Sequence, residues 1–243
     1  MDGFIRLVSD YKMRLNVTTG TFKRATKEFD KIEDARGKLY YNALRLINAG
    51  LVLDAHILIL ATWNTAAFRY ALRKFNLEAY QQTVHSISSD LTPLRASDLI
   101  HTDLAPHRPL ILKSFTALKN IRGVGVTGAS KVLHLINTGL FLPWDNYIRG
   151  QKMRKDFKNL TVVRRGFWPS GKFEGNGRGY YKFLLMCQQK FRHLVFHDSQ
   201  KTYAKQIDEF NFVNITVPLQ KIQGKREKAR KQRLKRPRVS RDK

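Results

Sequence analysis

Cysteine is almost absent from this chain of 243 residues, because Cys187 is the only one. A single cysteine cannot form a disulfide within the chain, and it cannot supply the thiolates of an iron–sulfur cluster or of a cysteine-ligated zinc site. We therefore expect no iron–sulfur cluster, and we interpret Cys187 as a small core residue. His101, His107 and His134 show no metal-ligand spacing, so we expect no metal and no other cofactor.

The chain also lacks a hydrophobic run long enough to cross a membrane. Its longest apolar stretch, LINAGLVLDAHILILATW, is interrupted by Asp54 and His56, whereas a spanning helix needs about 20 mostly apolar residues. The first residues, MDGFIRLVSDYKM, lack the basic segment and apolar core of a signal peptide. We therefore expect an intracellular monomer without a membrane partner, located in the nucleoid or nucleus if it binds DNA.

Acidic residues are scarce, since 19 Asp or Glu stand against 45 Lys or Arg and give a net charge of +26. A charge of that size favours a polyanionic partner, and nucleic acid is the first candidate. Residues 221–243 hold +10 of this charge, and their composition predicts a basic tail that is disordered when free. We interpret the tail as a phosphate-binding arm, with a solvated extension as the alternative. Residues 1–220 keep the other +16, so the body itself is basic.

Apolar residues recur at helical spacing along most of the body, which predicts an all-α fold with one helical domain over residues 1–220. The expected helices are one or two within 22–49, a long one over 51–74 with Asn76 as its C-cap, one from residue 77, one over 109–120 and one over 179–197. Residues 206–219 are interpreted as a short strand or extended segment. The glycine-rich stretch 150–180 is interpreted as a surface loop or a loop that contacts a nucleic-acid backbone.

The segment IRGVGVTGASKVLHLI, residues 121–136, places two glycines directly before a short helix. Gly123 and Gly125 can adopt backbone conformations that other residues avoid. We expect the helix to begin near Thr127, a candidate N-cap, and to direct its amides and the positive end of its dipole toward the turn. Such a turn binds a phosphate without any charged side chain. Lys131 and His134 are expected on a different face from the buried residues.

Residues 118–136 resemble the helix-hairpin-helix DNA-binding motif. The family pattern of apolar, glycine and alanine positions is met throughout, at Leu118, Ile121, Gly123, Val124, Gly125, Ala129, Val132 and Leu133. The resemblance implies that Gly123, Val124 and Gly125 hold a backbone phosphate of duplex DNA, or of structured RNA, without reading its sequence. Thr127 and Lys131 are further candidate nucleic-acid contacts.

Asp145 is the only acidic residue among nine Lys or Arg between residues 104 and 155. A carboxylate opposes phosphate binding, so its presence there indicates a specific task. One task is to cap a helix over residues 146–148, and the other is catalysis. The neighbouring Trp144 is either a core residue or a wall that stacks on an extruded base. Arg149 either neutralises Asp145 or binds phosphate.

The hairpin and Asp145 together resemble the helix-hairpin-helix (HhH-GPD) base-excision DNA glycosylase superfamily, in which a Pro-x-Asp segment follows the hairpin. Here the segment is PWD, and Asp145 lies 20 residues after Gly125. The resemblance implies a two-lobed helical domain with a cleft between the lobes. It also implies that Asp145 stabilises positive charge on the sugar or activates the attacking nucleophile. Thr127 stands where bifunctional members carry a Schiff-base lysine, which favours a monofunctional glycosylase over a lyase.

Two functions therefore stay open. The first is a DNA N-glycosylase that removes a damaged or mismatched base, and the second is a non-catalytic structural binder, associated with ribosomes or chromatin, on the same scaffold. Asn146 follows the aspartate at a position where the family has a small or β-branched residue. This difference leaves the activity of the site open. A catalytic protein should show Asp145 facing an open pocket, whereas a structural binder should show a closed cap and a filled cleft.

Overall fold

The computed structural model describes residues 17–63, 65–150, 173–194, 201–221 and 223–224. Every element assigned in this part of the chain is helical, so the all-α prediction is confirmed. Residues 225–243 of the expected basic tail and residues 151–172 of the glycine-rich stretch lie outside the described residues. None of the described helices is both long enough and apolar enough to cross a membrane.

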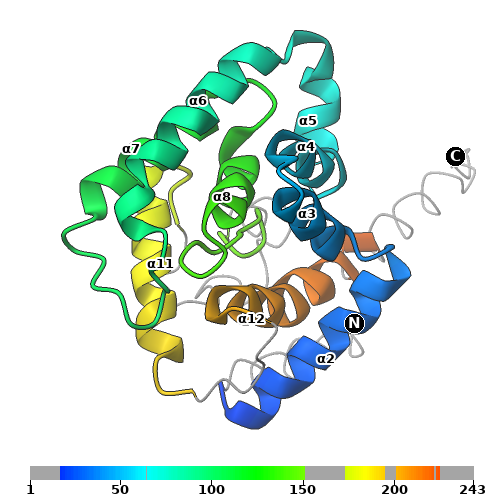
Figure 1. The fold of residues 1–243 in the computed structure, drawn as a ribbon. Helices are drawn as coiled ribbons and strands as arrows, with labels where there is room; N and C mark the ends of the chain where they lie inside the picture. Colours follow the sequence, from blue (N-terminus) through cyan, green and yellow to red (C-terminus); the bar gives the residue numbers. More distant parts are fainter. Residues whose placement is uncertain (1–16, 64, 151–172, 195–200, 222, 225–243) are drawn as a thin grey trace, which may run out of the picture.

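The elements follow one another along the chain as shown in Figure 1. The first half contains α2 (Thr19–Ala35), α3 (Leu39–Asn48), α4 (Val52–Trp63), α5 (Thr65–Ala71), the 3-10 helix η1 (Leu72–Lys74), α6 (Leu77–Asp90) and the 3-10 helix η2 (Thr92–Leu94). The second half contains α7 (Arg108–Asn120), α8 (Gly125–Ile136), α11 (Gly177–Phe191), α12 (Tyr203–Asn211) and the π-helix η3 (Phe212–Thr216).

The helix expected over residues 51–74 corresponds to α4, α5 and η1, in which the described residues from 52 to 74 are all helical. Residue 64, between α4 and α5, lies outside the described residues. The last three residues, 72–74, form the 3-10 helix η1 rather than α-helix. The Nζ atom of Lys131 donates a hydrogen bond to the carbonyl of Trp63 in α4.

Asn76 is an N-cap rather than the expected C-cap. Its Oδ1 atom accepts a hydrogen bond of 2.9 Å from the amide of Ala79, in the first turn of α6. The short amide side chain of asparagine suits either end of a helix, and the sequence alone did not indicate which end it serves.

The strand or extended segment expected over residues 206–219 is also wrong, because α12 and η3 occupy it. The side chain of Thr202 caps α12 by accepting from the amide of Lys205 at 3.2 Å. Every residue from 204 to 211 is buried, including charged ones. Ala204, Ile207 and Phe210 recur at helical spacing, a pattern that the strand interpretation overlooked.

Helix α8 lies at the centre of the molecule, surrounded by α3 to α7 in Figure 1. Its residues 128 to 135 are all buried, so Lys131 and His134 are buried as well rather than on an exposed face. The amphipathic pattern expected for this helix is therefore incomplete. The polar side chains of α8 are enclosed by other helices and find their hydrogen-bond partners there.

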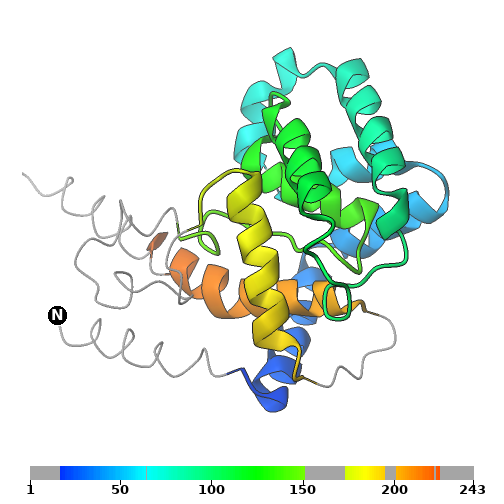
Figure 2. The same cartoon turned by 90° about the vertical axis from the view of Figure 1, so that its left-hand side faces the viewer.

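Helix α12 crosses beneath α8 and packs on α2, and α11 runs along α7 and reaches down toward α2 in Figure 2. Gly177 and Gly179 belong to the first turn of α11, capped by Asn176, rather than to a loop. A Cβ atom at Gly177 would lie 2.9 Å from the carbonyl oxygen of Leu112, so this glycine allows α11 to approach α7 closely. Cys187 of α11 is fully buried in the core, as expected.

Candidate nucleic-acid and catalytic site

The hairpin segment consists of α7, a turn over residues 121 to 124, and α8. The amide of Val124 donates to the carbonyl of Ile121 at 3.1 Å, which closes the turn. Apolar side chains of the motif pack between the two helices, and five of them are fully buried: Leu118, Val124, Ala129, Val132 and Leu133. The turn is thereby fixed to the core, which holds the start of α8 in one position.

The two glycines of the turn have different surroundings, although both have positive φ, +93° at Gly123 and +59° at Gly125. A Cβ atom at Gly123 would lie 3.0 Å from the Cβ atom of Ala71, so this glycine is needed for packing against α5. No atom lies within 4 Å of the corresponding position at Gly125. Gly125 therefore leaves open space at the start of α8, where a ligand can approach the backbone.

Helix α8 begins at Gly125, two residues earlier than expected, and Val124 is its N-cap residue. The expected capping role of Thr127 is therefore wrong, because Thr127 lies inside the first turn. Valine has no side-chain acceptor for the first amides of the helix, and these amides have no partner within the helix itself. Together with the helix dipole they make the electrostatic potential positive at this end of α8.

Asp145 both caps a turn and lines a cavity. Its Oδ1 atom accepts from the amides of Tyr147 and Ile148, each at 2.8 Å, and its Oδ2 atom accepts from the hydroxyl of Thr216 at 2.7 Å. The capped segment, residues 146–150, is a turn rather than the expected helix. The carboxylate is thus held in one orientation by residues near it in sequence and by η3.

The electrostatic environment of Asp145 contains opposing contributions. Burial raises the pKa of its carboxyl group above the ordinary value, and the hydrogen bonds from Ile148, Thr216 and Tyr147 together with the charge of Lys131 act in the opposite direction. Burial disfavours the ionised form, whereas donors and a nearby cation favour it. Burial is the largest of these contributions, so the pKa of the Asp145 carboxyl group lies above its ordinary value.

The segment that carries Asp145 is bound directly to α8. The hydroxyl of Ser130 accepts from the amide of Trp144 at 3.1 Å, and the indole Nε1 of Trp144 donates to the carbonyl of Val126 at 3.2 Å. Trp144 is only 1% exposed and packs edge to face against Phe115. Its ring therefore belongs mainly to the core, and its packing fixes Asp145 relative to the start of α8.

Lys131 lies on the same cavity wall as Asp145. Its side chain is 8% exposed, and its Nζ atom lies 5.7 Å from the centre of the Trp63 ring besides its hydrogen bond to the Trp63 carbonyl. Burial lowers the pKa of the Lys131 amine to about 8, and the charges of Asp145 and Asp208 oppose that shift. Lys131 therefore places a buried cation beside the candidate catalytic carboxylate.

Arg149 is the other basic residue at this end of α8. It is 7% exposed, and its guanidinium carbon lies 5.4 Å above the Trp144 ring. Its Nη2 atom donates to the side chain of Asn146 at 3.1 Å, while Nε and Nη1 have no hydrogen-bond partner among the described residues. Burial lowers the pKa of the guanidinium, and the charge of Asp145 opposes that shift. Two buried donors are thus available to an acceptor ligand.

These residues surround a cavity of about 700 Å³. Small-molecule sites have volumes of about 300–1,000 Å³, so the space suits a ligand the size of a nucleoside. The residues expected from the sequence that line it are Val124, Gly125, Thr127, Lys131, Trp144, Asp145 and Arg149. Gly123 lies outside the lining, on the side of the turn that packs against α5.

Several lining residues were not expected from the sequence. Aromatic side chains come from Phe29, Trp63 and Phe212, and further charges come from Arg36 and Asp208. They belong to α2 and its C-cap, to α4, and to α12 and η3, which are far apart in the chain. Asp208 and Phe212 are four residues apart, about one helical turn, so a helix places them on the same face. The interpretation of that segment as a strand hid this relation.

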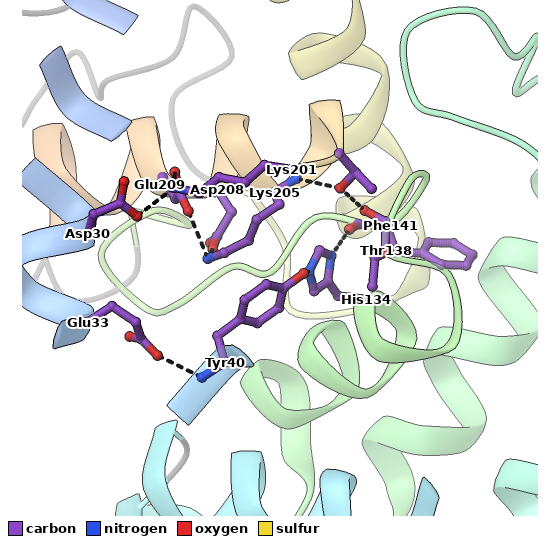
Figure 3. A network of polar contacts seen from close by, with 11 residues as sticks. Asp30, Glu33, Tyr40, His134, Thr138, Phe141, Lys201, Lys205, Asp208 and Glu209 are labelled. Carbon is purple, nitrogen blue, oxygen red and sulfur yellow. Dashed lines mark hydrogen bonds and ion pairs between the residues drawn. The ribbon is translucent and has the colours of Figure 1, made fainter. Parts of the chain in front are cut away.

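A buried polar network adjoins the cavity (Figure 3). Lys205 of α12 is paired with Asp208 at 3.0 Å and with Glu209 at 3.7 Å, and Lys201 joins Glu209 to Asp30. On the side of α8, Nδ1 of His134 binds the carbonyl of Phe141 at 2.7 Å and Nε2 binds the hydroxyl of Tyr40 at 3.0 Å. The network fixes α12 against α2, and so places Asp208 on the cavity wall.

Comparisons with known proteins identify no relative of this chain. No family model matches it, and neither the curated proteins nor the solved structures contain a match. Among the described residues, no group of three or more His, Cys, Asp or Glu side chains is arranged to hold a metal ion. The functional argument therefore depends on the geometry of the site.

Proposed function

We propose that this chain is a helix-hairpin-helix nucleic-acid-binding protein that acts as a monofunctional DNA glycosylase on a damaged or mismatched base. One observation carries the proposal: Asp145 lines a cavity of about 700 Å³ together with the first residues of α8. A carboxylate, an anion-binding helix end and a base-sized space are the three parts that this reaction needs. The net charge of +26 suits a nucleic-acid partner.

In this proposal the helices form two lobes. Helices α3 to α8 make one lobe, α2 and α12 make the other, and α11 runs along α7 down toward α2, with the cavity lined from both lobes. A backbone phosphate binds at the start of α8, where Gly125 leaves the first amides accessible. Because these contacts are to phosphate, they position the duplex and do not read its sequence.

The target nucleotide rotates out of the duplex into the cavity, since its glycosidic bond cannot be reached inside the helix. Trp63 and Phe212, which are partly exposed, provide aromatic faces for the extruded base. Trp63 is better placed for this than Trp144, whose ring is enclosed by core aromatics. The free donors of Arg149 suit an acceptor oxygen of the same nucleotide.

Asp145 acts on the sugar. As the C1′–N bond breaks, its electron pair leaves with the base and positive charge develops on C1′ and the ring oxygen. The carboxylate stabilises that charge, and it accepts a proton from the water that adds to C1′. The departing base takes up a proton from solvent. Thr216 and the two capping amides hold the carboxylate in place during these steps.

A second candidate function is non-catalytic binding of structured nucleic acid, as in a ribosome- or chromatin-associated protein. One observation favours it: both carboxylate oxygens of Asp145 already accept hydrogen bonds from the chain, as a purely structural cap requires. The high positive charge suits this function equally well, because each added phosphate contact strengthens non-specific binding.

Single-turnover base release from a panel of duplexes with one lesion each separates the two functions. The Asp145→Asn variant keeps an acceptor for the amides of Tyr147 and Ile148, so we expect it to fold and to bind duplex as the wild type does. We expect it to lose about 10²- to 10⁴-fold in the rate of base release. If the wild type releases no base from any duplex and binds structured RNA tightly, the chain is a structural binder and the glycosylase proposal is wrong.

A further inference from the structure

A second carboxylate, that of Asp208, lines the same cavity as Asp145. Asp208 lies on α12, 63 residues beyond Asp145, and is 6% exposed. Its Oδ2 atom accepts a hydrogen bond of 3.0 Å from Nζ of Lys205. Its Oδ1 atom has no hydrogen-bond partner in the described part of the chain. The ion pair therefore fixes the carboxylate and leaves one acceptor atom for a ligand.

Asp208 is not the only group that stabilises the buried charge of Lys205. Its ammonium is almost fully buried, 4.0 Å from the centre of the Phe29 ring and 4.4 Å from that of Tyr40. Glu209, which does not line the cavity, is a second carboxylate 3.7 Å from the same ammonium. With Asp30 bound to Lys201, the network holds three carboxylates for two lysines. Asp208 is the carboxylate of this network that reaches the cavity.

The chemistry around Asp208 defines the group that fits there. Partly exposed aromatic rings at Trp63 and Phe212 suit a planar ring. An ion-paired carboxylate only accepts hydrogen bonds, and it repels acceptor atoms on a ligand. Among the bases, guanine alone presents two neighbouring donors, the ring N1–H and the exocyclic 2-amino group, on the edge that pairs in the duplex. Uracil and thymine place carbonyl oxygens on both sides of a single N–H.

We propose that Asp208 is a specificity-determining residue, which accepts hydrogen bonds from the pairing edge of a flipped guanine-type base. This inference rests on the proposed glycosylase function and names its substrate class: oxidised or alkylated guanines. A site built to hydrogen-bond a donor group strongly rejects an analogue that lacks it, because the buried acceptor is then left unpaired. The 2-amino group is therefore the feature that the cavity distinguishes.

Matched base pairs test this selectivity. Duplexes carry 8-oxoguanine or 8-oxohypoxanthine, and 7-methylguanine or 7-methylhypoxanthine, so that the members of each pair differ only in the 2-amino group. Single-turnover release by the wild-type chain is expected to be about 10- to 100-fold faster for the amino-bearing member of at least one pair. This measurement needs no variant, and equal rates within both pairs would overturn the inference.

Two variants identify the residue responsible. In Asp208→Asn the one amide oxygen must face the Lys205 ammonium, which only donates, so the amide NH2 group faces the cavity in place of the acceptor Oδ1. We therefore expect the discrimination within a pair to fall to about 2-fold or less. Glu209→Gln changes the same ion network without altering the cavity lining, and we expect full discrimination. If the Asp208→Asn variant is folded, as its melting curve would show, and still discriminates within a pair, then Asp208 serves only as the ion-pair partner of Lys205.

The outcomes separate this inference from the function on which it rests. No release of any base would remove the glycosylase function and the inference with it. Release of uracil or of adenine derivatives in preference to all guanine derivatives would keep the glycosylase function and overturn only the selectivity assigned to Asp208.

Discussion

Asp145 serves two purposes with one carboxylate. The amides of Tyr147 and Ile148 bind Oδ1, and Thr216 binds Oδ2, so the cap also fixes the group at the cavity wall. Burial of a carboxylate costs free energy unless donors compensate for the lost hydration. The donors around Asp145 provide that compensation, and they also determine how far its pKa lies above the ordinary value.

Thr216→Val is expected to move the acidic limb of the pH–rate profile for base release to higher pH. The hydroxyl of Thr216 favours the ionised form of Asp145, so its removal raises the pKa of the carboxyl further. Activity needs the ionised form, and it is then lost at a higher pH as the solution is acidified. Thr216→Ser keeps the hydroxyl and should retain the wild-type profile. An unchanged profile in a folded Thr216→Val variant would show that Asp145 does not control the reaction.

Lys131 gives a second prediction for a single residue. Its ammonium is bound to the Trp63 carbonyl of α4, and its charge favours the ionised form of Asp145. A Schiff base requires the free amine to attack the sugar. We therefore expect borohydride to trap no covalent complex between the wild type and a lesion-bearing duplex at neutral pH. A trapped complex that disappears in Lys131→Gln would instead assign lyase activity to this lysine.

At the scale of elements, the turn between α7 and α8 offers a matched pair of glycines. Gly125 and Gly50 both have positive φ, +59° and +80°, and both have open space around a Cβ atom. Valine at either position is strained, at a cost of about 1–3 kcal/mol. Gly125→Val should also weaken duplex binding, because its side chain covers the amides at the start of α8, whereas Gly50→Val should only lower stability. Equal duplex affinity in both folded variants, measured by titration, would remove the phosphate site.

The sequence predicted the local features of the site better than the cavity itself. The spacing from Leu118 to Leu133 identified two helices and their turn, because the hydrophobic pattern and the two glycines are local signals. Asp145 was identified because it is isolated among basic residues. Asp208 and Trp63 were missed, because they reach the cavity only through the packing of α12 and α4 around α8. Helix α12 itself was missed because its segment was interpreted as extended, although Ala204, Ile207 and Phe210 recur at helical spacing.

At the scale of the whole molecule, the buried network makes stability depend on pH. Burial lowers the pKa of His134 to about 3, whereas a histidine in the unfolded chain has a pKa of 6.5. Between these values the unfolded state binds a proton that the folded state does not, so stability falls as the pH is lowered below 6.5. Glu209 opposes this effect, because burial raises its pKa to about 7 from 4.5. The contribution of Glu209 to the stability of the folded protein therefore increases as the pH falls from 7 toward 4.5.

His134→Asn isolates the contribution of the histidine. The asparagine side chain can still donate to the Phe141 carbonyl, as Nδ1 of His134 does, but it does not titrate. Between pH 7 and pH 5 the wild type should lose about 2 kcal/mol more stability than this variant, measured by urea unfolding. His85→Gln, at an exposed histidine, should keep the wild-type dependence. Parallel curves for the wild type and His134→Asn would show that His134 is not held neutral.

The distribution of charge over the whole chain gives the last prediction. Residues 225–243 contain eleven Lys or Arg and two acidic residues, while the described residues that line the cavity all belong to the body. Removing residues 225–243 should therefore weaken duplex binding and reduce the slope of log affinity against log salt, by about 0.9 for each phosphate that the tail neutralises. The rate of base release at saturating protein should stay unchanged, because none of the described residues of the proposed reaction site is removed. A tail of equal length with glutamine at every Lys and Arg position separates charge from chain length. If that neutral tail restores the affinity and the salt slope, the tail does not act through phosphate binding.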